Sequence, residues 1–126
     1  MPQSIIDQLP ENMAFLAPCA REMLAVRAAR YRPSVNAREY PEQALADELD
    51  QCSSEYQRIL GRALIKEFFS GSSDLFCERV TLLRTSLLKW MEPFRMHLEN
   101  AEVSILFTIV GSLGHPEAYL ETQRTD

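Results

Sequence analysis

Apolar side chains recur at helical spacing in the stretch that follows Pro41. They stand four or three residues apart, the spacing that lines one face of an α-helix, at Leu45, Leu49, Cys52, Tyr56, Ile59 and Ala63. Glu42 in the first turn and Lys66 in the last suit the helix dipole. Gly71 follows Ser70 and can adopt the left-handed backbone conformation that commonly ends a helix. The pattern predicts a helix from Pro41 to about residue 70.

A second helical pattern covers residues 74–91, with hydroxyl and carboxylate caps at Ser72, Ser73 and Asp74. Its apolar positions again step by four and three residues: Phe76, Val80, Leu83, Leu87 and Met91. Pro93 then follows without a glycine, asparagine or serine beside it. A proline either kinks a helix or ends it, so the sequence leaves open a long kinked helix or a reversal.

Helical spacing continues over residues 94–110, where the stretch Val103–Val110 is apolar nearly all round. A segment of that kind is surrounded by protein. Its β-branched residues also permit a strand, but no second strand exists to pair with it, so we expect a helix.

The N-terminal part repeats apolar residues at helical steps over residues 11–31. Pro18 interrupts this pattern, which predicts a short helix, a break, and a helix from about 18 to 31. We therefore expect an all-α fold, a helical bundle of about four main helices with residues 103–110 at its centre. Residues 1–126 form one domain, with a short N-terminal extension (1–10) and a polar C-terminal tail (115–126).

Composition and charge narrow the class of protein. Hydrophobic residues make up 46% and charged residues 25%, as in ordinary globular domains. A net charge of −5 disfavours binding to a nucleic-acid backbone. The chain lacks an export signal, a long apolar run and paired cysteine spacing, which predicts a cytoplasmic protein that neither enters the membrane nor relies on disulfides.

No motif for catalysis, metal binding or nucleotide binding occurs in the sequence. The four glycines build no phosphate loop, and neither histidine lies in a Glu-x-x-His or HExxH pattern. The acidic residues Asp47, Glu48 and Asp50 have no second acidic motif to face them, so we interpret them as a solvated helix face. We expect the three cysteines to be buried. Cys77 lies in the first turn of its predicted helix, where the helix dipole lowers the pKa of a thiol. The sequence predicts no catalytic residue, no cofactor and no enzyme activity.

Two neighbouring segments carry opposite charge. Residues 18–38 hold five arginines against one acid, and residues 39–55 hold six acids and no base. The two segments either pair across an antiparallel helix contact or leave an arginine face free for a partner. On the second interpretation Arg21, Arg27 and Arg30 contact that partner.

The predicted helices carry more apolar surface than a bundle of this size hides. Phe69 and Phe76 flank one short turn, and Leu82, Leu88 and Trp90 widen another face. Excess apolar surface usually marks an interface. We therefore predict a non-enzymatic protein–protein interaction module (an adaptor, regulator or small chaperone) that acts as a homodimer or bound to a partner protein, through the three arginines with Phe69, Phe76 and Trp90. The alternative is a helical bundle that binds a small ligand or cofactor near His97 or Cys77.

Overall fold

The computed structural model describes residues 3–121, and all regular structure in that range is helical. The helices, including three short 3-10 segments, are η1 (Ile6–Gln8), η2 (Glu11–Met13), α1 (Leu16–Arg30), α2 (Pro41–Phe68), α3 (Ser73–Met91), η3 (Glu92–Phe94), α4 (Ala101–Ser112) and α5 (Glu117–Leu120). The all-α prediction with four main helices is therefore confirmed for the described part of the chain.

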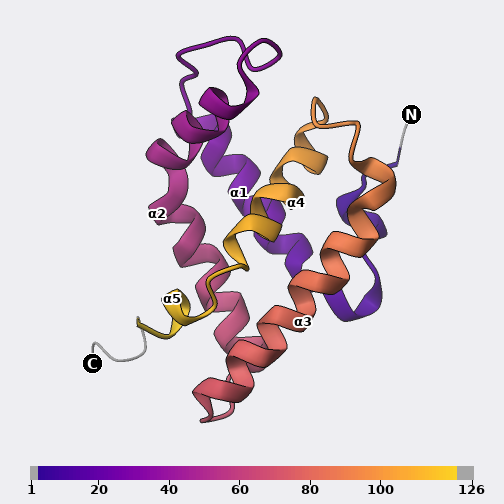
Figure 1. Cartoon of the computed structure of the whole chain (residues 1–126), viewed down its shortest axis with the longest axis vertical. Coiled ribbons are helices and arrows are strands. Elements are labelled where there is room, and N and C mark those ends of the chain that lie inside the picture. Colours follow the sequence, from indigo (N-terminus) through magenta and orange to yellow (C-terminus); the bar gives the residue numbers. More distant parts are fainter. Residues whose placement is uncertain (1–2, 122–126) are drawn as a thin grey trace.

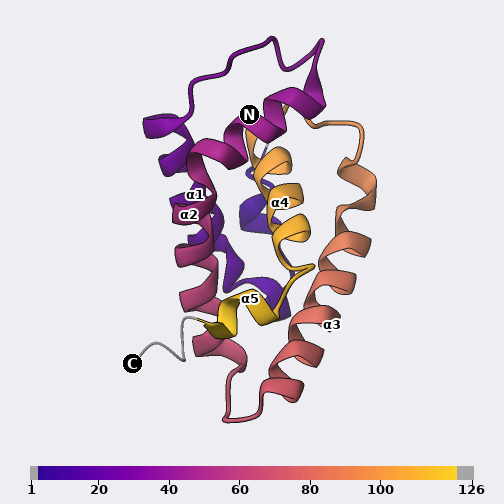
Figure 2. The ribbon, with the colours of Figure 1, turned by 60° about the vertical axis from the view of Figure 1, so that its left-hand side comes forward.

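Helix α4 lies at the centre of the bundle, between α2 and α3 and against α1 (Figures 1 and 2). Its side chains at Val103, Ile105, Leu106 and Ile109 are completely buried. This confirms the expectation for residues 103–110 and follows from their composition, because burying so many large apolar groups is what stabilises the fold.

The chain reverses direction between α3 and α4, so no long kinked helix forms around Pro93. Helix α3 ends at Met91, and Pro93 lies in the short 3-10 turn η3. Asn100 then begins α4, because its side chain accepts hydrogen bonds from the N–H groups of Glu102 (2.9 Å) and Val103 (3.3 Å). The reversal lays α4 antiparallel to α3 (Figure 1).

Both ends of the described chain pack onto the bundle. In the expected N-terminal extension (1–10), Ile6 and Leu9 belong to the core, and only residues 1–2 lie outside the description. In the expected polar tail (115–126), Tyr119 and Leu120 of α5 are buried, and residues 122–126 lie outside the description. The 3-10 turn η1 at one end and the four-residue helix α5 at the other bring these few apolar residues to the core.

The buried face of α2 differs from the predicted stripe. It runs along Ala44, Glu48, Cys52, Tyr56, Leu60 and Leu64. Leu45 is 46% exposed and Leu49 is only partly buried, which corrects their assignment to the core. Helix α2 also ends at Phe68, and Gly71 takes its left-handed conformation (φ 98°) in the turn beyond it.

Candidate functional site

A buried ion pair joins α1, α2 and α4. The Arg27 guanidinium donates through Nη2 to Glu48 Oε2 at 3.0 Å and to Ser104 Oγ at 3.1 Å. The Tyr56 hydroxyl donates to the same Glu48 oxygen at 2.9 Å. The side chains of Arg27 and Glu48 are 15% and 7% exposed. Burial and the nearby Glu48 carboxylate raise the pKa of Tyr56, so its hydroxyl stays protonated.

The position of Glu48 corrects the interpretation of the acidic segment as a solvated face. Glu48 is turned inward because α1 packs antiparallel against α2 and brings Arg27 opposite it (Figure 1). Arg30 likewise approaches Glu55, with 3.6 Å between Nη2 and Oε1. The basic and acidic segments therefore pair within the molecule at these positions.

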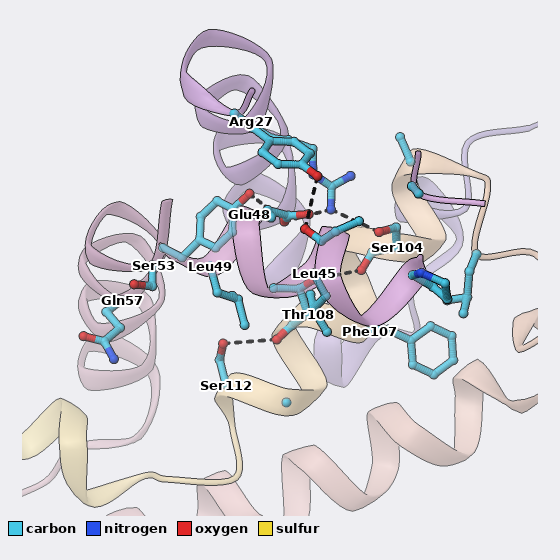
Figure 3. Close-up of a pocket in the computed structure, with 18 of the residues that line it drawn as sticks. Arg27, Leu45, Glu48, Leu49, Ser53, Gln57, Ser104, Phe107, Thr108 and Ser112 are labelled. Atoms are coloured by element: carbon cyan, nitrogen blue, oxygen red, sulfur yellow. Dashed lines mark hydrogen bonds and ion pairs between the residues drawn. The ribbon is translucent and has the colours of Figure 1, made fainter. Parts of the chain in front are cut away.

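A groove runs along the outside of this ion pair, between α2 and α4. Its volume is about 1380 Å³. Leu45 and Leu49 of α2 form one wall, and Ser104, Thr108 and Ser112 of α4 form the other (Figure 3). Arg38 and Leu98 lie at the end where both helices begin, and α5 closes the other end (Figure 2).

Apart from Phe107, the α4 wall is made of small residues, and the hydroxyl groups of Ser104, Thr108 and Ser112 on it already have hydrogen-bond partners. Thr108 Oγ1 donates to the Ser104 carbonyl and Ser112 Oγ donates to the Thr108 carbonyl, both at 3.1 Å. A Cβ added at Gly111 meets nothing within 4 Å, so this glycine borders open space. At these small residues the wall lets another backbone approach closely. The hydroxyl groups on it need no hydrogen bonds from a bound partner.

Large apolar side chains stand exposed at the mouth of the groove. Leu45 is 46% exposed and Leu98 is 56% exposed, and both line the groove. Tyr40 and Met96 are also exposed, but they do not line the groove. Soluble proteins rarely gather such residues around a concave surface without a binding role.

Helix α5 closes the lower end of the groove through Tyr119. Its ring lies against Gly61, where an added Cβ would be 3.1 Å from Tyr119 Cδ1. Its hydroxyl donates to the Ser112 carbonyl at 3.2 Å. Burial raises the pKa of Tyr119 to about 12. The contact fixes a short helix that has too few residues to be stable alone.

The residues predicted to contact a partner do not share one surface. Phe76 is completely buried in the core, so its proposed partner contact is corrected: the ring is covered within the chain, where Phe69 packs edge-on with 6.2 Å between ring centroids. Phe69 itself is partly exposed, and Trp90 is half-buried against Phe94. Arg21 is exposed and forms an ion pair with Asp7.

The remaining candidates are the cysteines, His97 and the clusters of acidic side chains. No group of three or more histidine, cysteine or carboxylate side chains able to hold a metal ion occurs there. Burial raises the pKa of Cys19 to about 11 and also raises the pKa of Cys52 and of Cys77. The expected lowering at Cys77 is therefore corrected, because desolvation and the neighbouring Glu117 and Asp74 outweigh the helix dipole. His97 is exposed.

Sequence reasoning missed the groove because it placed Leu45 and Leu49 in the core. Two faces of α2 compete for the interior, one led by Leu45 and Leu49 and the other by Ala44 and Glu48. The sequence did contain one signal of the true buried face. Glu48 stands four residues before Cys52, on the helix face that also carries Tyr56. Its buried partner, Arg27, lies on another helix, so spacing within α2 did not reveal it.

Two further findings complete the description of the site. Across the described helices, none has both the length and the apolar character needed to cross a membrane. Protein-family models, curated proteins and solved structures contain no match to this chain.

Proposed function

We propose that the protein is a non-catalytic interaction module whose α2–α4 groove receives a helix of another protein chain. The observation that carries this proposal is the apolar groove with exposed leucines on its walls and mouth. Recognition of an amphipathic helix by an apolar groove is a common mode of protein association.

The length of the groove favours a helix over a compact ligand. Lining residues extend from Pro41 to Gln57 along α2, which is about 24 Å at 1.5 Å per residue. Sites for small molecules usually enclose roughly 300–1,000 Å³. The volume of about 1380 Å³ and the open shape suit a longer, thicker occupant.

The exposed leucines at the mouth of the groove also favour a helix as its occupant. A small molecule seated in the groove would leave much of Leu45 and Leu98 in water, because these two lining residues are 46% and 56% exposed. A docked helix covers such an edge as well as the floor. This argument favours a protein partner over the alternative of a small-ligand or cofactor-binding bundle.

The chemistry of the groove supports binding without catalysis. The Glu48 carboxylate is engaged by Arg27 and Tyr56 and so is not presented to a ligand as a free base. The raised pKa of each cysteine disfavours the thiolate that nucleophilic catalysis requires. Arg27, Glu48 and Tyr56 hold the helices together, and the groove would bind its partner through its shape and apolar surface.

Site-specific photocrosslinking tests this function. A benzoylphenylalanine residue is placed at Leu98, which lines the groove and is 56% exposed, and in a separate variant at Glu22, which is exposed on α1. The proteins are expressed in the native cell, irradiated, and their adducts identified by mass spectrometry.

The proposal predicts a discrete protein adduct from position 98 and none from position 22. The adduct contains either another protein or a second copy of this chain. Absence of any protein adduct from position 98 contradicts the proposal. A small molecule retained in the groove through native mass spectrometry favours the ligand-binding alternative.

A further inference from the structure

An aromatic side chain of the protein itself occupies the lower end of the groove. Tyr119 of α5 lines the groove together with Ala118. Its ring packs on α2, where the Cβ position of Gly61 lies 3.1 Å from Tyr119 Cδ1. Its hydroxyl donates to the Ser112 carbonyl of α4 at 3.2 Å. Tyr119 therefore contacts both of the helices that form the walls of the groove.

Gly61 provides the seat for this ring. It is a buried glycine inside α2, and a glycine in the interior of a helix weakens that helix. The contact with Tyr119 gives the position a structural reason, because the Cβ of any other residue at position 61 would crowd the ring. We call this position the Gly61 seat.

The Gly61 seat lies where the groove would continue along α2. The α2 residues that line the groove extend as far as Gln57, and Gly61 follows one helical turn later on the same side. Helix α5 lies across the lower parts of α2 and α3, below the end of α4 (Figure 2). It therefore covers a part of α2 that a longer occupant of the groove would reach.

Helix α5 has little structure of its own to hold it in place. It contains four residues, begins without a side-chain cap, and is joined to α4 through residues 113–116. The amides of Ala118 and Tyr119 donate to the carbonyls of His115 and Pro116, both at 3.1 Å. So short a helix is stable only on the surface against which it packs. Its docking can change without unfolding of the four longer helices.

We propose that α5 is a displaceable plug of the groove, and that the partner helix competes with Tyr119 for the Gly61 seat. This inference rests on the proposed function and concerns the regulation of the same site. When α5 is displaced, the partner gains the Gly61 seat in addition to the surface between Pro41 and Gln57. Because binding then includes the displacement of α5, a docked α5 lowers the apparent affinity for the partner.

Amide hydrogen exchange, measured by NMR on the full chain, tests whether α5 opens on its own. The amides of Ala118 and Tyr119 are expected to exchange at least roughly tenfold faster than those of Leu60 and Ile105 in the core, and low concentrations of urea leave their rate unchanged. If they exchange at the rate and with the urea dependence of the core, α5 opens only with the whole bundle and the inference is overturned.

A disulfide between α2 and α5 gives one protein in which the plug is either pinned or loosened. Gly61→Cys and Tyr119→Cys are combined, since the Cβ position of Gly61 lies 4.0 Å from Tyr119 Cγ and the two sulfurs come within bonding reach. Cys77→Ser removes the one native cysteine that is not fully buried. Oxidation pins α5 to α2, and reduction releases it without the ring that seated it. Circular dichroism confirms that both forms are helical.

Photocrosslinking from position 98, at the end of the groove away from α5, compares partner binding by the two forms. Each form carries benzoylphenylalanine there and is irradiated at subsaturating concentration in a lysate of the native cell. The yield of the protein adduct is expected to rise at least about tenfold on reduction, the factor for a plug that is open in roughly one molecule in ten. The Cys77→Ser protein without the cysteine pair gives equal yields with and without reductant. Equal yields from the pinned and the loosened form, or a higher yield from the pinned form, overturn the inference.

Two substitutions of Tyr119 test the ring in the same assay without a disulfide. Tyr119→Ala empties the Gly61 seat and raises the yield of the adduct. Tyr119→Phe keeps the ring and removes the hydroxyl that donates to Ser112, so its yield lies between those of the unmodified protein and Tyr119→Ala. The crosslinker at position 22 gives no adduct in either variant, which excludes nonspecific association of a loosened protein. An unchanged yield in Tyr119→Ala contradicts a plug.

The crosslinking results separate this inference from the proposed function. An adduct whose yield does not depend on α5 retains the proposed function and removes the plug. If no form gives a protein adduct from position 98, the proposed function fails, and the regulation of its site fails with it.

Discussion

At the scale of single residues, the main polar contact inside the bundle is the buried ion pair between Arg27 and Glu48. Two opposite charges are withdrawn from water and satisfied by three helices, since Ser104 and Tyr56 share the contacts. Arg27 Nε is buried and has no hydrogen-bond partner. A buried pair of this kind contributes little net stability over an apolar pair, but removing one partner strands the other charge.

Replacing Glu48 with Gln tests this asymmetry. The substitution keeps the size of the side chain and leaves the Arg27 charge uncompensated in the interior, so we expect the free energy of unfolding to fall by about 2–4 kcal/mol. Urea denaturation monitored by circular dichroism measures the change. Glu55→Gln is the matched control, because Glu55 pairs with exposed arginines and its loss costs about 0.5 kcal/mol. Equal losses for both variants contradict the prediction.

At the scale of helices, Glu102 clamps the N-terminal segment to the start of α4. Its carboxylate accepts hydrogen bonds from Ser4 Oγ at 2.8 Å and from the Ile6 N–H at 3.0 Å. These contacts hold Ile6 and Leu9 in the core although η1 is only three residues long. A segment so short depends on the clamp for its order.

Substitution of Glu102 by Ala is expected to release this segment. The variant loses the two hydrogen bonds that the Glu102 carboxylate accepts from Ser4 and Ile6, which lowers the free energy of unfolding by about 1–3 kcal/mol. Hydrogen–deuterium exchange then shows faster exchange of the amides in residues 5–9, while α2 keeps its protection. Glu99→Ala, a change at an exposed acidic residue nearby, serves as control and leaves exchange in 5–9 unaltered. Unchanged exchange in the Glu102 variant disproves the clamp.

Helix boundaries were predictable where a local cap marks them. Ser72 begins α3 as expected, since its hydroxyl accepts from the Leu75 N–H at 3.1 Å. The start of α4 differs from the expected helical segment over residues 94–110, because Asn100 caps the helix and residues 95–99 lie outside it. The sequence also left the rotation of α2 undecided. That rotation depends on Arg27 from another helix, a contact that no spacing within α2 encodes.

At the scale of the molecule, six buried or partly buried acids share one direction of pKa shift. Burial raises the pKa of three thiols and three phenols, namely Cys19, Cys52, Cys77, Tyr31, Tyr56 and Tyr119. In the unfolded chain these groups lose their protons at lower pH than in the folded one. Stability is therefore complete below the ordinary thiol pKa and is lost as pH rises through the folded values.

Alkaline conditions are thus expected to destabilise the fold. The pKa of Cys19 rises from 9.0 to about 11, so its contribution disappears between these pH values. That contribution is on the order of 2 kcal/mol. Urea denaturation from pH 8 to pH 11 should show a midpoint that falls above pH 9. In the Cys19→Ala variant the fall is shallower, and a midpoint independent of pH refutes the shared direction.

Trp90 gives the protein an optical reporter at a single place. It is the only tryptophan of the chain, and it lies half-buried against Phe94, with 5.3 Å between ring centroids. Its emission therefore records solvent entry where α3 turns into η3, whereas circular dichroism averages all the helices. A difference between fluorescence and dichroism melting curves would reveal whether this corner opens before the remainder melts.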